Sequence, residues 1–248
     1  MIDTHSHIIP GIDDGARDLS ESLAFARSAV KQGVEIIFAT PHAFNGVYNN
    51  TKQSILDACL NLSDFFNEKG ISLKIVPGAE IRVNHDLIKK YDNGSLLTLN
   101  NSGTHLLIEL PEMFMTNAVS MMIRQLCDRG VTPIVAHAER NGMIYNNPDL
   151  AAEFIYNGAL IQITAGSLTG EFGKFAMKTA QTLVIQDQVF CIGSDIHPGR
   201  RYCMAKAEKK LIKLVGRSKA GLITKTNPSA VLNSLGVENK NIFMEKAF

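Results

Sequence analysis

"TPIVAHAER" runs from Thr132 to Arg140 and combines two features in nine residues. Its first half is a short apolar run, typical of a strand that is buried on both faces of a parallel sheet. Its second half places His137, Glu139 and Arg140 at the end of that strand. In parallel α/β folds the carboxyl ends of the strands are where active sites are built. This stretch therefore predicts both a strand and a position close to a functional site.

The same arrangement recurs along the chain. Short apolar runs predict strands at Met1–Thr4, Val34–Thr40, Ile71–Val76, His105–Leu110, Thr132–His137, Ala159–Thr164 and Val189–Ser194. Amphipathic stretches predict helices at Asp18–Gly33, Thr51–Lys69, Thr116–Arg129, Pro148–Asn157, Glu171–Asp187, Cys203–Val215 and Pro228–Leu235. The segment Asn84–Asn101 predicts a short helix and a loop. Strands that alternate with helices indicate an α/β fold with parallel strands.

The number of strand–helix units favours a barrel. Seven units follow one another without a linker or a low-complexity segment, which predicts a single domain over residues 1–248. An open, doubly wound sheet is the alternative. No G-x-G-x-x-G follows any of the strands, which weakens the dinucleotide-binding form of that alternative.

Composition excludes several classes of protein. Of 248 residues, 45% are hydrophobic and 20% are charged, as in ordinary globular proteins. The net charge of +1 gives no reason to expect a nucleic-acid or membrane partner. No signal peptide and no apolar run of transmembrane length is visible, so we expect a cytoplasmic protein. The four cysteines are widely spaced, and none has Arg six residues later, which excludes the cysteine-based tyrosine phosphatases.

Metal-capable side chains gather at the predicted strand ends. Five of the seven histidines lie there, and the exceptions are His85 and His105. The strand-end residues are His5, His7, His42, Glu80, Glu109, His137, Asp195 and His197. For a single histidine a satisfied core or surface position would be the better interpretation. For five of them together with carboxylates, a common site is the better interpretation, because unpaired buried polar groups seldom cluster.

Imidazole and carboxylate without thiolate is the donor set of Mn, Fe, Zn or Mg sites. His5 and His7 are two residues apart on a strand end, so both imidazoles can reach one ion. Eight or nine donors are too many for one ion and predict a site of two or three metals. Such clusters carry out hydrolytic phosphoryl chemistry. Arg140 and Arg200 each follow a strand-end histidine by three residues and could bind phosphate oxygens; the alternative for each is a surface salt bridge.

In this order, the motifs "HSH", "PH", "GAE", "AHAER" and "SDIH" resemble the PHP (polymerase and histidinol phosphatase) superfamily, whose members have a distorted (βα)7, TIM-like barrel and a trinuclear metal site. More narrowly, "MIDTHSHIIPGIDDGA", "ATPHAFNGVY", "VPGAEIRV", "VAHAERN" and "ITAGSLTGEFGK" resemble the manganese-dependent protein-tyrosine phosphatases of bacterial capsule and exopolysaccharide operons. The resemblance covers nearly the whole chain. Relatives often have "HPER" where this chain has "HAER", a difference that concerns loop stiffness rather than a ligand.

The resemblance implies three metal sites, most naturally for Mn²⁺, with Fe or Zn as alternatives. The first takes His5, His7, Glu80 and Asp195. The second takes Glu80 as a bridge, Glu109 and His137. The third takes His42, His197 and an acid of "DDG", which the resemblance places at Asp14 rather than Asp13; the acid that is not a ligand would face solvent. Asp14, Arg140 and Arg200 are the candidate catalytic residues.

The implied reaction is hydrolysis of phosphotyrosine on a bacterial tyrosine autokinase that controls polysaccharide synthesis and carries a C-terminal tyrosine cluster. A hydroxide that bridges the ions would attack phosphorus in line. One alternative is a phosphatase for a small metabolite such as histidinol phosphate. A more remote alternative is a non-catalytic module that docks on the kinase, which would have lost ligands that this chain retains.

Four further features have open interpretations. "FNGVY" (44–48) could line a phosphotyrosine groove or form an ordinary loop. "TAGSLTG" (164–170) looks like a phosphate-binding loop, but a simple connection is favoured. The basic stretch Lys206, Lys209, Lys210, Lys213 and Arg217 is better explained as a solvated face than as a docking site for an acidic tail. Asp3 could orient a ligand imidazole or be a polar residue at the strand edge.

Overall fold

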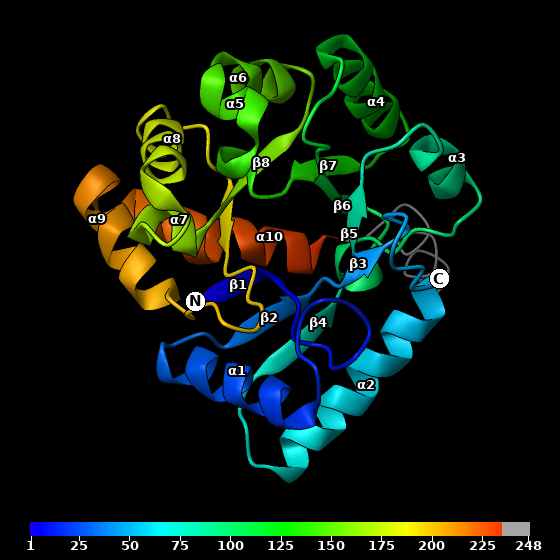
Figure 1. The fold of residues 1–248 in the computed structure, drawn as a ribbon, viewed down its shortest axis with the longest axis vertical. Coiled ribbons are helices and arrows are strands. Elements are labelled where there is room, and N and C mark those ends of the chain that lie inside the picture. The colour runs from blue at the N-terminus through cyan, green and yellow to red at the C-terminus, as the bar shows by residue number, and fades with distance from the viewer. Residues whose placement is uncertain (235–248) are drawn as a thin grey trace, which may run out of the picture.

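A computed structural model of the chain describes residues 1–234. These residues form an α/β fold in which a curled sheet of parallel strands is surrounded by helices (Figure 1). The predicted end of the last helix at Leu235 and residues 235–248 of the predicted domain lie outside the described part.

All the strand pairs in the ladders are parallel, as the sequence predicts. One ladder has the order β1-β2-β4 and the other has the order β3-β5-β6-β7-β8-β9. The strands are β1 (Ile2–Ser6), β2 (Ile36–Ala39), β3 (His42–Ala43), β4 (Lys74–Pro77), β5 (Glu80–Arg82), β6 (His105–Glu109), β7 (Thr132–Val135), β8 (Leu160–Thr164) and β9 (Cys191–Gly193).

The second and third barrel positions are each built from two short strands rather than one. The chain leaves the ladder at Thr40–Pro41, between β2 and β3, and at Gly78–Ala79, between β4 and β5. Proline has no N–H to donate to a ladder, which explains the first break. The pieces β3 and β5 were not predicted, and both begin on a residue expected at the metal site, His42 and Glu80.

The ring closes between β9 and β1 without a regular ladder. There the Thr4 hydroxyl donates to the carbonyl of Ile192 at 2.9 Å, and the backbone N–H of Asp195 donates to the carbonyl of His5 at 2.8 Å. The order around the ring is that of the seven predicted strand positions. The expected α/β class, a distorted seven-position barrel in a single domain, is confirmed.

Most helices follow the strands and lie on the outside of the sheet, whereas the last helix, α10, crosses behind the centre of the ring (Figure 1). The helices are α1 (Leu19–Lys31), α2 (Lys52–Glu68), α3 (Leu87–Asp92), α4 (Thr116–Asp128), α5 (Gly142–Asn146), α6 (Asp149–Tyr156), α7 (Ala165–Thr169), α8 (Gly173–Ile185), α9 (Met204–Gly221) and α10 (Asn227–Asn233). Short turns of helix are η1 (Leu99–Asn101), η2 (Ala138–Arg140) and η3 (Leu222–Thr226). Within residues 1–234 we find no helix with the length and apolar character needed to cross a membrane.

Local sequence explains the main helix boundaries. The Asp18 side chain accepts the N–H of Glu21 at 2.9 Å and caps α1, and Thr51 forms a capping box with Ser54 at the start of α2. Two expectations need correction. The helix expected to end at Val215 continues to Gly221 as α9, with a non-helical backbone at Gly216. The connection expected over residues 164–170 contains the short helix α7.

Two apolar clusters hold the fold together. The larger one lies between the sheet and the outer helices. The smaller one fills the interior of the ring with residues such as Phe38, Leu107 and Ile134, and Val231 of α10 packs into it. Asn227 of α10 donates to the carbonyl of Phe190, at the beginning of the last strand. Because α10 covers the beginnings of the strands, the opposite end of the barrel is left to the polar strand ends.

Candidate metal centre

An irregularity in β1 brings its histidines into the barrel. Ile2 packs in the interior cluster, and strict alternation would place His5 on the opposite face. The register of β1 on β2 shifts between Asp3 and Ser6, and the side chain of His5 lies inside the ring. Gly193 of β9 makes room for it, because a Cβ at position 193 would lie 2.5 Å from the Cβ of His5.

Four donor atoms from different parts of the chain surround one point. His5 Nε2 lies 3.1 Å from His7 Nε2, 3.3 Å from Glu80 Oε2 and 3.5 Å from Asp195 Oδ1. His7 Nε2 lies 3.3 Å from the same Glu80 oxygen and 3.4 Å from the same Asp195 oxygen. A tetrahedral ion with bonds of about 2.0–2.2 Å has donors about 3.3–3.6 Å apart. The donor atoms of His5, His7 and Glu80 all lie within 4.8 Å of one another, and the distances from both imidazoles to Asp195 fit the same divalent ion.

Hydrogen bonds on the far side of each ring fix which nitrogen faces this point. The Gln162 amide donates to Thr4 Oγ1 at 2.8 Å, so its carbonyl oxygen accepts from His5 Nδ1 at 2.9 Å. His7 Nδ1 donates to Asp13 Oδ2 at 2.7 Å. Both Nε2 atoms are therefore the ones that face the carboxylates and are available to a cation at this point. This outer arrangement is typical of metal-ligating histidines.

The electrostatics of this group call for a positive charge. Burial acts to lower the pKa of His7, but hydrogen bonds to Asp13, Asp195 and Glu80 outweigh it and hold that pKa well above its usual value. Burial acts to raise the pKa of Asp195, but Arg140, His7 and His5 lower it well below its usual range. Without a metal, a proton on imidazole supplies the charge that the carboxylates require. A divalent cation at the same place would replace that proton.

A second group adjoins the first through Glu80. Glu80 Oε1 lies 2.7 Å from His137 Nε2, and Glu80, Glu109 and His137 each place a donor atom within 4.8 Å of the others. Burial, followed by the charge of Glu80, raises the pKa of Glu109 to about 7. Two carboxylates this close are costly unless a cation lies between them.

A third group lies on the other side of His7. It contains His7, Asp14, His42 and His197, and Asp14 Oδ1 lies 3.6 Å from His42 Nε2 and 3.4 Å from His197 Nε2. All three residues expected at the third site are thus together, and His7 is added to them. The Asp14 side chain is 51% exposed, so this group opens to solvent.

Asp13 does not face solvent, although the acid of "DDG" that is not a ligand was expected to. Its side chain is fully buried, and besides His7 it accepts the backbone N–H groups of His42 at 3.0 Å and Gly15 at 2.9 Å. The two neighbouring aspartates of "DDG" therefore have different roles. Asp14 offers an oxygen to the third group, while Asp13 orients a histidine of the first group and holds the loop.

The donor sets of the three groups fit divalent cations. Each consists of imidazole nitrogens and carboxylate oxygens. Within the described residues the buried Nδ1 of His42 lies 3.1 Å from Glu80 Oε2 but has no hydrogen bond of good geometry. His7 and Glu80 are shared between groups, as bridging or adjacent ligands of a metal cluster would be. The arrangement can hold up to three neighbouring ions.

Two of the strand-end residues have an unusual backbone. His137 has φ of 33° and Asp195 has φ of 50°, both in the left-handed region. His137 is thereby turned toward Glu80 immediately after β7. Non-glycine residues in this region are uncommon, and the strain is typical of functional sites.

Both predicted phosphate-binding arginines lie beside the metal donors. Arg140 Nη2 and Arg200 Nη1 each lie 2.7 Å from Asp195 Oδ2. Their guanidinium groups also lie over the ring of Phe172, at 4.7 Å and 5.2 Å from its centroid. Phe172 fits against α7 because a Cβ at Gly166 would lie 2.6 Å from the ring. The segment 164–170 thus connects elements, as favoured, and also provides the seat for this ring.

Of the two interpretations of Asp3, the structure supports the polar residue at the strand edge rather than one that orients an imidazole. Asp3 instead accepts the backbone N–H groups of His5 and Ser194 and the hydroxyl of Tyr202 at 2.6 Å, which ties β1 to the end of β9. Sequence reasoning also missed Gln162 and Phe172 as site residues. Gln162 is a polar residue within an apolar strand, and that pattern was the available signal. Phe172 had no such signal.

Glu139 plays a supporting role. It is fully buried and accepts the N–H of Thr164 at 3.0 Å and the hydroxyl of Ser167. Burial raises the pKa of its carboxyl group. These bonds join η2, which carries Arg140, to the start of α7, which seats Phe172.

Comparisons with known proteins agree with this geometry. The model of a family described as "Capsular polysaccharide synthesis, CpsB/CapC" matches residues 1–233. Tyrosine-protein phosphatase YwqE from Bacillus subtilis (strain 168) is 38% identical over 197 residues, which is 79% of this chain and 77% of the relative.

Solved structures add a fold comparison. A chain from the crystal structures of YwqE from Bacillus subtilis and CpsB from Streptococcus pneumoniae, described as unique metal-dependent tyrosine phosphatases, matches with a TM-score of 0.90 and 34% identity over 96% of both chains. The histidinol phosphate phosphatase from Lactococcus lactis, with zinc, histidinol and phosphate bound, matches with a TM-score of 0.56. It is 13% identical and covers 90% of this chain and 94% of its own, so it shows a common fold alone.

Proposed function

The chain belongs to the CpsB/CapC family of capsular polysaccharide synthesis, and from this membership and the geometry of its metal centre we propose that it is a metal-dependent protein-tyrosine phosphatase. The observation that carries the proposal is the set of three adjoining donor groups with two arginines directed at the same carboxylate. A cluster of cations bordered by guanidinium groups is suited to a phosphate monoester.

The residues proposed as metal ligands are His5, His7, Asp14, His42, Glu80, Glu109, His137, Asp195 and His197. Manganese is the proposed metal, because imidazole and carboxylate donors without thiolate suit it; the same donors accept iron or zinc. When bound, the metals supply positive charge to the phosphoryl oxygens and a nucleophile at neutral pH.

The chain's own residues place the substrate. Arg140 and Arg200 each have guanidinium donors beside the centre and can bind phosphoryl oxygens, which fixes the phosphorus relative to the strand ends. Positive charge there also stabilises the oxygens as charge accumulates on them. The leaving group is a phenolate, whose conjugate acid has a pKa of about 10. It needs less protonation on departure than an alkoxide, and we assign no general acid.

A cysteine mechanism has no support. Burial raises the pKa of Cys59 and of Cys191 to about 12, so neither is a thiolate at neutral pH. Metal-dependent catalysis at the strand-end donors therefore fits this structure better than a cysteine mechanism does.

The proposed substrate is the phosphorylated C-terminal tyrosine cluster of an autokinase that controls polysaccharide synthesis, and the proposed location is the cytoplasm. The family description supports a role in polysaccharide synthesis, and the names of the relatives support a tyrosine-phosphorylated substrate. A phosphatase for a small metabolite such as histidinol phosphate is the second candidate, but its structural support is a likeness at 13% identity. A docking module without activity would have lost donors, and all nine proposed ligands are present.

The test is phosphotyrosine hydrolysis as metal is removed and restored. We expect no turnover of a phosphotyrosyl peptide after complete chelation, recovery with Mn²⁺, and a much lower kcat/KM for histidinol phosphate. His42→Ala and Arg140→Ala should lose turnover while keeping the native circular dichroism spectrum. Full activity in verified metal-free protein would refute the proposal, and a preference for histidinol phosphate would favour the second candidate.

A further inference from the structure

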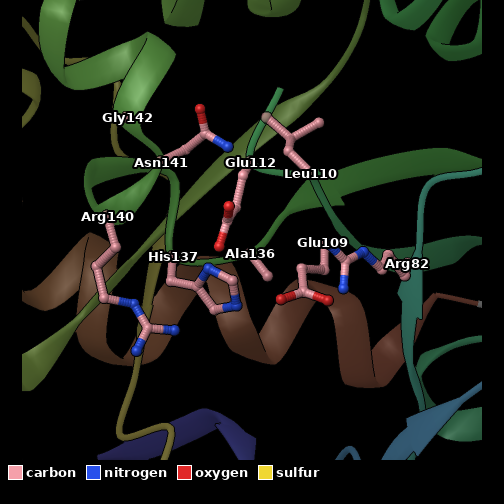
Figure 2. A pocket seen from close by; sticks show the side chains of 9 residues that line it. All are labelled: Arg82, Glu109, Leu110, Glu112, Ala136, His137, Arg140, Asn141 and Gly142. Carbon is pink, nitrogen blue, oxygen red and sulfur yellow. The ribbon is translucent and has the colours of Figure 1, made fainter. Parts of the chain in front are cut away.

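A cavity beside the metal centre is bordered by a third arginine. The cavity has a volume of about 310 Å³ and lies between Arg82 and Glu109 on one side and His137 and Arg140 on the other (Figure 2). It opens directly over Glu109 and His137, two members of the second donor group. Its size is at the lower end of the range for small-molecule sites, roughly 300–1,000 Å³.

The backbone places Arg82 in this wall. Arg82 ends β5, two residues after Glu80, so both side chains leave the strand on the same face. In the pairing of β5 with β6, Arg82 lies opposite Glu109 and Glu80 lies opposite Leu107. One strand face therefore carries first a carboxylate of the metal centre and then a guanidinium closer to the barrel mouth.

The guanidinium of Arg82 differs from those of Arg140 and Arg200. The latter two are paired with Asp195. Arg82 is half-buried, and within residues 1–234 no carboxylate oxygen lies within ion-pair distance of it. Figure 2 shows its side chain reaching along the cavity wall toward Glu109. A partly desolvated guanidinium with free donors gains most from a ligand that brings its own negative charge.

Arg82 also separates this cavity from a second one of about 440 Å³, which is lined by Phe44, His85 and Lys90 among others. Arg82 and Arg140 border the first cavity from opposite sides (Figure 2). An anion held at the second donor group would then have a guanidinium on each side.

We propose that Arg82 binds the phosphoryl group of the phosphotyrosyl substrate from the side opposite Arg140. This inference rests on the proposed phosphatase function and deepens it, because it adds a substrate-binding residue that neither sequence motifs nor metal-donor geometry identified. Arg82 donates to phosphoryl oxygens in the bound state and does not ligate metal.

The experiment uses the metal-loaded full-length protein with Arg82→Gln and Arg82→Lys. The control is Arg27→Gln, an exposed arginine on α1. Three measurements are made: kcat and KM for a phosphotyrosyl peptide, the inhibition constant of inorganic phosphate, and Mn²⁺ affinity and stoichiometry by calorimetry.

For Arg82→Gln we expect both KM and the phosphate inhibition constant to rise about tenfold or more, as for the loss of a charge-assisted hydrogen bond. Arg82→Lys should recover part of the loss, Arg27→Gln should match the parent protein, and Mn²⁺ binding should be unchanged in all three. A phosphate inhibition constant within twofold of the parent value in Arg82→Gln would overturn the inference. So would a loss of Mn²⁺ affinity that accounts for the change, because Arg82 would then only balance charge.

If the proposed phosphatase function is wrong, the result differs from the one expected if only the inference about Arg82 is wrong. In that case the parent protein itself would not hydrolyse the phosphotyrosyl peptide, and phosphate binding measured directly by calorimetry would still report on Arg82.

Discussion

The amide of Gln162 determines which nitrogen of His5 is available to a metal. Its carbonyl oxygen accepts from His5 Nδ1, and its own N–H is held by Thr4, so the amide cannot rotate without losing a bond. Oriented in this way, His5 keeps a lone pair on Nε2 at the centre of the first donor group.

Gln162→Leu should therefore weaken metal binding without removing a ligand. We expect a loss of about 10- to 100-fold in Mn²⁺ affinity, the usual effect of losing a partner behind a ligand histidine. Calorimetric titration of metal-free protein measures it. Gln125→Leu, at an exposed position on α4, is the control. Unchanged affinity in Gln162→Leu would mean that the barrel alone fixes the ring.

The raised pKa of Glu109 links metal binding to pH. The folded, metal-free protein holds this proton more tightly than the unfolded chain, so the proton's stabilising contribution is present at low pH and is lost as pH rises through about 7. A metal needs the carboxylate, so binding must displace the proton.

We expect Mn²⁺ affinity to be at least about tenfold weaker at pH 6 than at pH 8, the effect of one proton with a pKa near 7. Calorimetry in two buffers of different ionisation enthalpy also counts the released protons. Glu109→Gln should release fewer protons over this range. The same proton count in that variant as in the parent would assign the effect to other groups.

At this scale the sequence predicts which residues meet but not how each is oriented. His5, Glu80 and Asp195 could be placed together because parallel strand ends converge on one face of a barrel. The burial of Asp13, the bond from Gln162 and the contacts of Asp3 depend on angles set by the β1 irregularity. No local pattern encodes those angles.

Among the elements, the segment from α7 to the start of α8 positions the two arginines that lie on Asp195. The ring of Phe172 lies under both guanidinium groups, and Gly166 allows it to sit there. Arg140 arrives on η2 and Arg200 on the loop after β9, so one ring holds together two elements that are distant in sequence.

Phe172→Leu should raise KM for a phosphotyrosyl peptide by about five- to thirtyfold, the effect of losing two cation–π contacts of about 0.5–1 kcal/mol each. We expect a smaller change in kcat, unchanged Mn²⁺ content, and recovery in Phe172→Tyr. Phe175→Leu, at an aromatic position that is 71% exposed, is the matched control. Equal effects in Phe172→Leu and Phe175→Leu would contradict a specific role for the ring.

The order of strands and helices was predictable because regularly spaced apolar residues, separated by turn residues, recur along the chain. The broken strands β2–β3 and β4–β5 were not, since a two-residue strand such as His42–Ala43 has no period to detect. The prediction for α9 ended too early because the sequence after Val215 contains glycine, serine and charged residues that usually follow a helix.

In the whole molecule, structural and chemical roles lie at opposite ends of the barrel. α10 seals the interior at the beginnings of the strands (Figure 1), while the carboxyl ends place Glu80 and Glu109 in one donor group and Asp14 and Asp195 beside the histidines of the adjoining groups. Without cations, protonated histidines and the two arginines have to balance these buried carboxylates.

Chelation should therefore lower the Tm of the protein, and Mn²⁺ should restore it. Ligand at a hundredfold excess over Kd stabilises a fold by about 2.7 kcal/mol, which corresponds to roughly 5–10 °C for a chain of this size. Scanning calorimetry with and without chelator measures the shift. An unchanged Tm in protein shown to be free of metal would contradict a structural contribution from the ions.

The contact between the first strand and the last helix affects the order in which a newly made chain can assemble. β1 closes against β9, so the ring stays open until the chain has been synthesised through β9, and the interior is sealed only after Val231 has been added. A ribosome-bound fragment ending before β9 contains His5 and His7 but lacks the strand they close against. Such dependence on distant contacts slows folding and leaves partly made chains open to aggregation. In the cell, this protein's yield should therefore depend on chaperones during translation more than its modest size suggests.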